Sequence, residues 1–296
     1  MNEYEYWKNF SLGTELETSG IFIYNGLKQI NDLYHYEESE DVFEILYNLS
    51  VGFERLMKIL IILTENQENT DQEAFEKDLI THNLDTLQQR IERNHKLGLN
   101  DIQKEFLNLL TGFYKKQRYD RFNLNDSNNY TKDKDCLFDF LVRKLNINKI
   151  GTFRNTKQIK SFLVKIVSNI STKLYERIEF TANKLQICTN DLRKNGKAYR
   201  IFVYKDFNFK IQNTLKKELF ITLMHSENSN FLKFIKSIQP IPFDVEDENE
   251  IINMLLSESN LENHFDELET FYEKLEDKKE RLNMLEAIGK KGIEFL

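Results

Sequence analysis

The chain contains only two prolines in 296 residues, Pro240 and Pro242, and this feature restricts its fold more than any other. Proline normally occurs in turns and at the edges of strands, so an all-β or loop-rich protein of this length would contain more of it. Apolar residues instead recur at helical spacing, most clearly over residues 42–63. We therefore predict an all-α protein, and the 40% of hydrophobic residues is enough for a sizeable core.

The same spacing predicts helices over residues 41–63, 78–96, 100–113, 136–145, 157–185, 214–238, 246–256 and 261–288. The first of these should be long and central. Asn100 or Asp101 can cap the helix that ends at residue 113, and Thr156 or Lys157 begins the helix that runs to residue 185. One region differs. Apolar residues flank the dipeptide Asn195-Gly196, which favours a two-residue turn. We predict one small β-hairpin there.

Charged residues divide the chain into three parts. Residues 1–142 contain 15 Lys and Arg against 26 Asp and Glu, residues 143–236 contain 20 against 6, and residues 237–296 contain 6 against 16. The Asn- and Asp-rich stretch 123–135 is the best candidate for a domain boundary. We predict a helical domain over 1–125, a basic and mostly helical domain over 135–243, and acidic C-terminal helices over 244–296 that pack on or beside the basic domain.

Several classes of function are disfavoured. The two cysteines are too few for a disulfide framework or a four-thiolate zinc site, and the five histidines lack metal-ligand spacing, so we expect no metal and no cofactor. No apolar run reaches the length of a membrane span, and residues 1–10 do not resemble a secretory signal. Signatures of phosphate-binding loops, dinucleotide-binding folds and zinc proteases are absent. We expect a cytoplasmic protein that does not enter the membrane.

Polar residues of the first domain form a candidate catalytic cluster. Glu54, Arg55 and Lys58 share the first long helix, and the segments 81–83 and 117–121 flank the next helices. Histidine can transfer protons near neutral pH, and arginine binds phosphate through its planar guanidinium. His82 and Arg118 together suit phosphodiester cleavage without a metal, with a base for the ribose 2′-hydroxyl and a cation for the phosphorane. The alternative is that His82 caps a helix and Arg118 pairs with a carboxylate.

The basic domain contains candidate nucleic-acid-binding residues. Single-strand binding sites combine cations that bind phosphates with aromatic side chains that stack on bases. The candidates lie beside aromatic residues in two stretches: Arg154, Lys157 and Lys160, and then Arg193, Lys194, Lys197 and Arg200. They predict RNA or single-stranded nucleic acid as a partner. The alternative is that the aromatic side chains belong to the core and the cations are solvated.

The segment 43–63, FEILYNLSVGFERLMKILIIL, resembles the first long helix of HEPN (higher eukaryotes and prokaryotes nucleotide-binding) domains. ITHNLDTL at 80–87 and QRYDRF at 117–122 resemble segments of HEPN-like bacterial proteins. The resemblance covers about residues 20–122 and implies a helical bundle that often dimerises. Many members are metal-independent ribonucleases of toxin–antitoxin, antiviral-defence or CRISPR-linked systems, and others are inert partners of nucleotidyltransferases.

Active members of that family carry an Arg followed, after four to six residues, by a His. Arg90 and His95 have this spacing, although Ile91 stands where a polar residue is usual. The resemblance therefore implies an RNA-engaging ribonuclease with Arg90 and His95 as the catalytic pair, and His82 and Arg118 remain the alternative pair. It further implies a homodimer or a partner protein of the same operon. The competing hypothesis is a non-catalytic helical interaction protein that binds a partner subunit.

Overall fold

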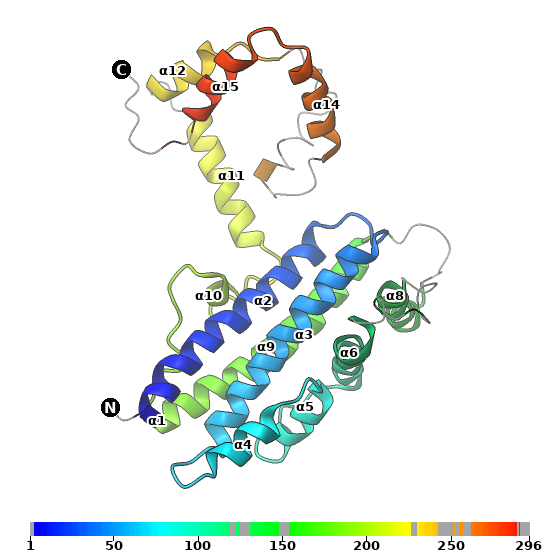
Figure 1. Cartoon of the computed structure of the whole chain (residues 1–296), viewed down its shortest axis with the longest axis vertical. Coiled ribbons are helices and arrows are strands. Elements are labelled where there is room, and N and C mark those ends of the chain that lie inside the picture. The colour runs from blue at the N-terminus through cyan, green and yellow to red at the C-terminus, as the bar shows by residue number, and fades with distance from the viewer. Residues whose placement is uncertain are drawn as a thin grey trace. The chain divides into compact units, whose positions relative to one another are not determined.

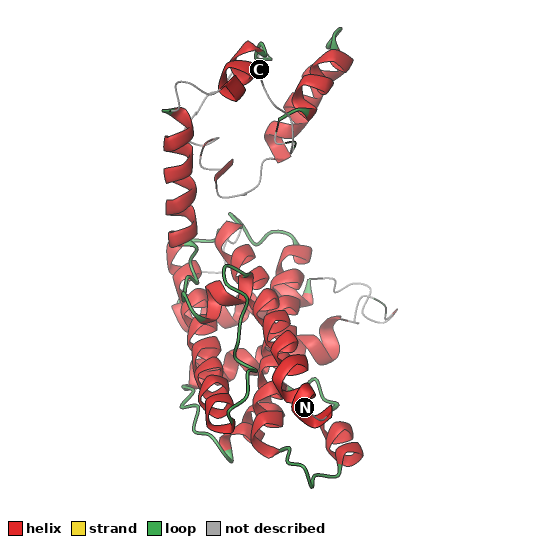
Figure 2. Cartoon of the chain, turned by 90° about the vertical axis from the view of Figure 1, so that its left-hand side faces the viewer, coloured by secondary structure: helices red, strands yellow, loops and turns green. Residues whose placement is uncertain are grey.

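The computed structural model describes residues 3–118, 122, 124, 131–147, 154–225, 230–241, 252, 255, 256, 262–288 and 290, without the side chains of Asp133 and of residues 262–267. Throughout these residues the regular secondary structure is helical and no strand occurs (Figure 1 and Figure 2). The protein is therefore all-α, as predicted. The chain divides into two compact units, residues 1–209 and residues 210–296.

The first unit is built around three long helices, α2 (Leu12–Asp32), α3 (Ser39–Glu65) and α9 (Lys157–Leu185). α3 runs antiparallel to α2, and α9 packs against both (Figure 1). Shorter elements surround these three, of which η1 and η2 are π-helical: α1 (Glu3–Tyr6), η1 (Trp7–Ser11), α4 (Gln72–Leu79), α5 (Leu84–Glu92), α6 (Asp101–Gly112), η2 (Phe113–Gln117), α8 (Lys132–Leu145) and α10 (Lys197–Phe202).

α3 is the central element of this unit. Phe53, Leu56 and Leu60 have no exposed surface, and the helix contacts α2, α5, α6, α8 and α9. Burying one such side chain stabilises a fold by about 1.5–3 kcal/mol relative to leaving it exposed. The prediction of a long central helix over 41–63 is therefore confirmed, and the helix extends two residues further at each end.

Two lysines from distant parts of the sequence bind the carboxyl ends of the long helices. Lys160 Nζ donates to the carbonyl of Asn31 at the end of α2, and Lys8 Nζ donates to the carbonyl of Asn66 after α3, at 2.6 Å. The last carbonyls of a helix lack partners and carry partial negative charge, so an ammonium group stabilises them. Burial lowers the pKa of both lysines. Lys160, a predicted nucleic-acid contact, therefore has a structural partner.

The predicted β-hairpin around Asn195-Gly196 is wrong. Asn195 adopts a φ of 64°, as a tight turn requires, but Gly196 is the N-cap of α10. Ile201 and Phe202 are then buried from a helix that packs against α2 and α9. The Asn-Gly signal was correct for the turn. It contains no information on the element that the turn leads into.

The helix predicted over 78–96 is interrupted. α4 ends at Leu79, and α5 begins at Leu84 with Asn83 as its N-cap, whose side chain accepts from the backbone N–H of Thr86 at 3.2 Å. The caps predicted at Asn100 and Thr156 are confirmed. The alternative in which His82 caps a helix is therefore wrong, because Asn83 is the N-cap of α5.

The compact units differ from the predicted domains over 1–125, 135–243 and 244–296. α8 and α9 follow the expected boundary, yet both pack against α3, and Leu137, Phe140 and Leu174 lie fully buried in the same core. A stretch rich in Asn and Asp indicates a loop, and a loop can join two helices of one core as readily as two domains. The observed division follows Phe209.

The second unit contains α11 (Lys210–Met224), α12 (Asn230–Ser237), α14 (Glu262–Glu273) and α15 (Lys278–Glu286). The helices predicted over 214–238 and 261–288 are therefore each divided in two. The helix predicted over 246–256 lies mostly outside the described residues. No residue of α11 or α12 is buried, and Arg281 of α15 donates to the carbonyl of Gln239 at 2.6 Å.

Candidate functional site

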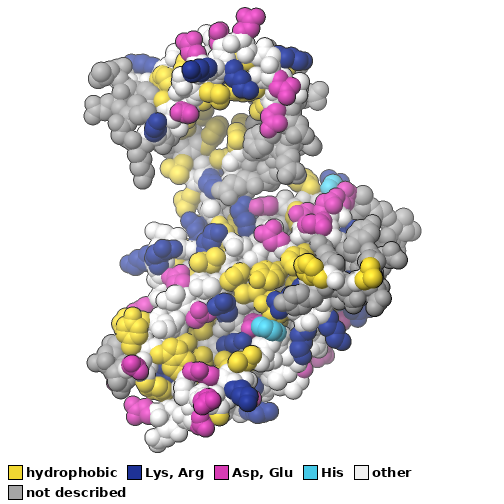
Figure 3. All heavy atoms as spheres, in the orientation of Figure 1, with side chains coloured by type: hydrophobic (Ala, Val, Ile, Leu, Met, Phe, Trp, Pro, Cys, Tyr) yellow, Lys and Arg dark blue, Asp and Glu magenta, His cyan; other side chains and the backbone are white. Residues whose placement is uncertain are grey.

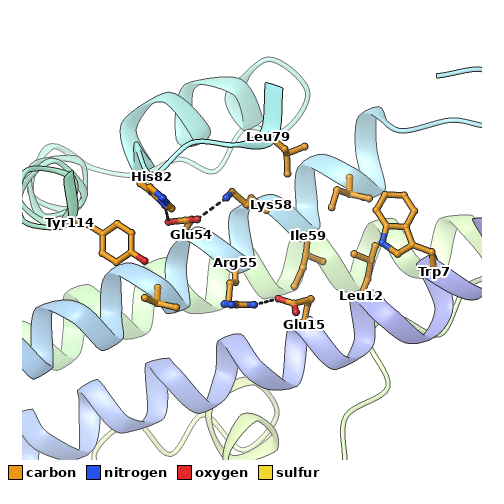
Figure 4. Close-up of a pocket in the computed structure, with 12 residues that line it drawn as sticks. Trp7, Leu12, Glu15, Glu54, Arg55, Lys58, Ile59, Leu79, His82 and Tyr114 are labelled. Atoms are coloured by element: carbon orange, nitrogen blue, oxygen red, sulfur yellow. Dashed lines mark hydrogen bonds and ion pairs between the residues drawn. The ribbon is translucent and has the colours of Figure 1, made fainter. Parts of the chain in front are cut away.

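A pocket of about 350 Å³ opens on the first unit, where α3 passes close to the start of α2 and to the connection between α4 and α5 (Figure 4). α3 forms its floor with one face of the helix, which includes Val51, Glu54, Arg55, Lys58, Ile59 and Ile62. The walls come from five other segments through Trp7, Leu12, Glu15, Leu79, His82 and Tyr114. Two of the three polar segments predicted to cluster, those of Glu54 and of His82, thus meet in this pocket.

One end of the pocket is organised around Glu54, which is only 7% exposed. Its Oε2 lies 3.0 Å from His82 Nδ1, and its Oε1 accepts from Lys58 Nζ at 2.6 Å. Figure 4 shows His82 and Lys58 on either side of this carboxylate. A carboxylate only accepts hydrogen bonds, so His82 Nδ1 carries a proton and Nε2 is the basic atom of the neutral ring. The His82 side chain is 48% exposed, which leaves the ring open to a ligand.

The ring of Tyr114 contacts both His82 and Arg118, the alternative catalytic pair. Its ring centroid lies 5.0 Å from that of His82, and the guanidinium carbon of Arg118 lies 3.8 Å from the Tyr114 ring centroid. Burial, and then the charge of Glu54, raise the pKa of Tyr114, whereas Arg118 lowers it. His82 and Arg118 therefore contact the same aromatic ring. Of the segment 117–121, residues 119–121 lie outside the described residues.

The other end of the pocket is apolar. Trp7, Leu12 and Ile59 lie together there, and an ion pair between Arg55 and Glu15 separates them from the His82 end (Figure 4). An aromatic and aliphatic surface next to cations suits a ligand with a flat apolar part and an anionic part, such as a nucleotide. Trp7, Glu15 and Tyr114 were not predicted as site residues, because an isolated aromatic residue or carboxylate has no distinctive spacing in the sequence.

Arg90, the arginine of the family spacing, binds carboxylates. Its guanidinium contacts Glu65 at 2.7 Å and Asp78 at 2.6 Å, and it lies 5.4 Å from the ring centroid of Phe75. The side chain is only 15% exposed. Arg90 thus joins the end of α3 to α4 and α5. A ligand phosphate would have to compete with both carboxylates.

His95, the histidine of the same spacing, lies after the end of α5 and is bound to α3. Its Nε2 is 2.8 Å from Thr64 Oγ1, whose single proton is donated to the carbonyl of Leu60 at 2.7 Å. His95 Nε2 therefore carries a proton that Thr64 accepts, and Nδ1 is its basic atom. Burial, and then the charges of Arg177 and Lys184, lower the pKa of His95. The structure brings Arg90 and His95 to neighbouring residues of α3 but gives them different partners.

The predicted nucleic-acid contacts lie at separate places on the first unit. Arg154 and Lys157 are exposed near the start of α9, where Arg154 forms an isolated backbone bridge with His35. Lys197 donates to Asn25 Oδ1 at 2.8 Å, and Arg193 donates its backbone N–H to Glu17. Lys194 is exposed and Arg200 is half-buried. The carboxylate of Glu17, from α2, thus lies against the second basic stretch.

On the face of the molecule drawn in Figure 3, Lys and Arg side chains are mixed with Asp and Glu side chains, and hydrophobic side chains gather between them over the first unit. This face therefore does not present a single sign of charge. Among the described residues, no three His, Cys, Asp or Glu side chains are grouped as metal ligands would be. None of the described helices is long and apolar enough to cross a membrane.

No known protein family, curated protein or solved structure matches the chain.

Proposed function

We propose that the protein engages RNA and cleaves it without a metal, using His82 in the pocket on α3. The observation that carries this proposal is the bond between Glu54 and His82 Nδ1, which orients an exposed imidazole and leaves Nε2 as the atom that can take a proton from a ligand when the ring is neutral. A carboxylate behind a histidine is the arrangement by which general bases are oriented. The proposal is of the HEPN-like type, with the pair His82 and Arg118 in place of Arg90 and His95.

In the proposed reaction, His82 Nε2 takes the proton of a ribose 2′-hydroxyl and the 2′-oxygen attacks the adjacent phosphorus. The 5′-oxygen leaves and receives the proton back from the imidazolium, which gives a 2′,3′-cyclic phosphate and a 5′-hydroxyl. Lys58, which shares the Glu54 carboxylate with His82, and Arg118, which contacts the Tyr114 ring, would stabilise the phosphorane. Trp7 offers an aromatic surface for the base of the bound nucleotide.

The test is cleavage of single-stranded RNA by the full chain in the presence of EDTA. We expect His82→Ala to reduce the rate about 100-fold or more, because general-base catalysis contributes at least that much. His225→Ala is the matched control, since His225 is exposed at the end of α11, outside the pocket, and should leave the rate unchanged.

Two results would count against the proposal that His82 cleaves RNA. Loss of activity in His95→Ala with full activity in His82→Ala would assign the reaction to the pair Arg90 and His95. Intact RNA after incubation with the wild-type protein would reject the ribonuclease function.

One observation favours the alternative of a non-catalytic interaction protein. α11 contains no buried residue, and its apolar side chains Ile211, Leu215 and Leu219 are each at least half exposed. Apolar residues four apart lie on one side of a helix, and such a face is often covered by a partner. Under this alternative, Leu215→Glu would abolish capture of the partner and His82→Ala would not.

A further inference from the structure

The C-terminal half of α9 carries a row of cations with an exposed aromatic residue among them. Lys173, Arg177, Phe180 and Lys184 are spaced by four, three and four residues, which places all of them on one side of the helix. The Phe180 side chain is 58% exposed. Eleven residues of helix extend over roughly 16 Å. An exposed phenylalanine between cations is not explained by packing of the core.

Among the residues that the structure describes, no carboxylate forms an ion pair with the cations of this row. Lys173 Nζ donates to the carbonyl of Gly98, and Arg177 donates to the carbonyl of Lys96 at 3.4 Å. A carbonyl is neutral, so these bonds hold the loop after α5 and leave the positive charges uncompensated. By contrast, the guanidinium groups of Arg55 and Arg90 bind carboxylates. An ammonium group has three donors and a guanidinium five, so both have donors left for a ligand.

The two acidic residues of this part of α9 interact with side chains outside the row of cations. Glu176 pairs with Lys205 at 3.1 Å. The charge of Glu179 acts on Tyr175, whose ring stacks on Phe202 of α10 with centroids 4.8 Å apart. Glu176 lies beside the row, three residues from Lys173 and four from Phe180, but its carboxylate pairs with Lys205; Glu179 projects to a different side of the helix.

His95 lies close to this row of cations. His95 lies in the loop that Lys173 and Arg177 bind, and after burial the causes that lower its pKa are the charges of Arg177 and Lys184. Lys96 is exposed in the same loop. Positive charge is therefore concentrated between α9 and the loop after α5.

We propose that Lys173, Arg177, Phe180 and Lys184 of α9, together with Lys96, form a binding surface for single-stranded RNA. The cations bind successive phosphates, and Phe180 stacks on a base, which is the combination used by single-strand binding proteins. Thr64, which holds His95, and Glu54, which holds His82, are ten residues apart on α3, or roughly 15 Å along its axis. The surface is thus distinct from the pocket, and binding there does not require that the protein cleaves RNA.

The test measures binding of a fluorescent single-stranded 2′-O-methyl RNA of about twelve nucleotides to the full chain, by anisotropy at several salt concentrations. This probe has no free 2′-hydroxyl, so the proposed cleavage cannot alter it. The variant Lys173→Gln, Arg177→Gln, Lys184→Gln keeps amide donors for the carbonyls of the loop. Its matched control is Arg193→Gln, Lys194→Gln, Lys197→Gln, which removes the same three charges from the other basic stretch.

We expect the α9 variant to bind at least about ten times more weakly than the control and to lose roughly 2 units of the log–log salt slope, at about 0.7 per phosphate contact. Phe180→Ala, which removes no charge, should weaken binding about fivefold or more at an unchanged slope. Equal losses in the two triple variants, full affinity in Phe180→Ala, or no binding by the wild-type protein would each overturn the proposal. Absence of cleavage with ordinary RNA would reject only the ribonuclease function.

Discussion

His95, which is bound near the end of α3, contributes to the pH dependence of the stability of the first unit. His95 donates to Thr64 and faces Arg177 and Lys184, and its pKa lies below its ordinary value of 6.5. Above that pH the ring is neutral in the folded and in the unfolded chain and contributes nothing to the pH dependence. As the pH falls below 6.5, the unfolded chain takes up a proton that the folded chain resists. The free energy of unfolding therefore decreases on acidification.

The first prediction is that His95→Gln removes the contribution of His95 to the decrease in the free energy of unfolding on acidification. Glutamine can still donate to Thr64 Oγ1 but does not titrate. We expect the free energy of unfolding of the variant to vary less than that of the wild type between pH 6.5 and about 5.5, above the range in which most carboxylates titrate. Urea unfolding at each pH measures the free energy of unfolding of both proteins. His225→Gln should keep the wild-type dependence, and an unchanged dependence in His95→Gln would contradict the assignment.

The sequence was sufficient to select Glu54 and His82 in the pocket and Arg118, which contacts Tyr114, and insufficient to explain how they meet. His82, Arg118 and Glu54 could be named because their side chains suit proton transfer and phosphate binding. Their convergence depends on Tyr114, which a sequence pattern assigns to the core like any other aromatic residue. The ion pairs that hold Arg90 join residues 12 and 25 positions apart in the chain, and spacing along a single helix does not reveal such partners.

At the scale of helices, close packing of α10 on α2 depends on one glycine. A Cβ built at Gly20 would lie 2.4 Å from the Cβ of Ala198 and 2.9 Å from Cε2 of Phe202. Gly112, near the end of α6, has helical φ and ψ of −60° and −47° and no atom within 4 Å of an added Cβ. The same substitution should therefore have opposite effects at the two positions.

The second prediction is that Gly20→Ala destabilises the first unit by about 1–3 kcal/mol, because overpacking forces α10 away from α2. Gly112→Ala should stabilise it by up to about 1 kcal/mol, since alanine favours the helix. Urea denaturation followed by circular dichroism compares the two variants. Equal effects of the two substitutions would show that the contact between α10 and α2 is not tight.

Long helices could be predicted from the sequence and short ones could not, for physical reasons. α3 and α9 were predicted because a long helix repeats its apolar spacing many times, and α6 because a possible cap at Asn100 or Asp101 precedes apolar residues at helical spacing. The structure adds that Asn100 and Gln103 form a capping box. α2 was not predicted, and α10 was predicted as a strand. α10 has only six residues, from Lys197 to Phe202, so its apolar positions fit either period and only its packing on α2 makes it helical.

At the scale of the whole molecule, the two compact units predict where the chain can be divided. The third prediction is that a fragment of residues 1–209 folds, because the core of α2, α3, α8, α9 and α10 is complete within it. It should show a helical circular dichroism spectrum and cooperative thermal unfolding. A fragment of residues 1–125 should not fold cooperatively, because it exposes the surfaces of α3 that α8 and α9 cover. A stable, cooperative 1–125 fragment would contradict the shared core.

The N-terminal segment has a consequence for the synthesis of the protein. Thr189 Oγ1 donates to the carbonyl of Lys8, and the backbone N–H of Cys188 donates to Asn9 Oδ1 at 2.9 Å, so residues about 180 positions apart are joined. A ribosome releases the N-terminal segment long before the residues that it binds. Lys8 and Asn9 must therefore wait for these partners until α9 and the residues that follow it have emerged. We expect this segment to be a binding target for chaperones during translation.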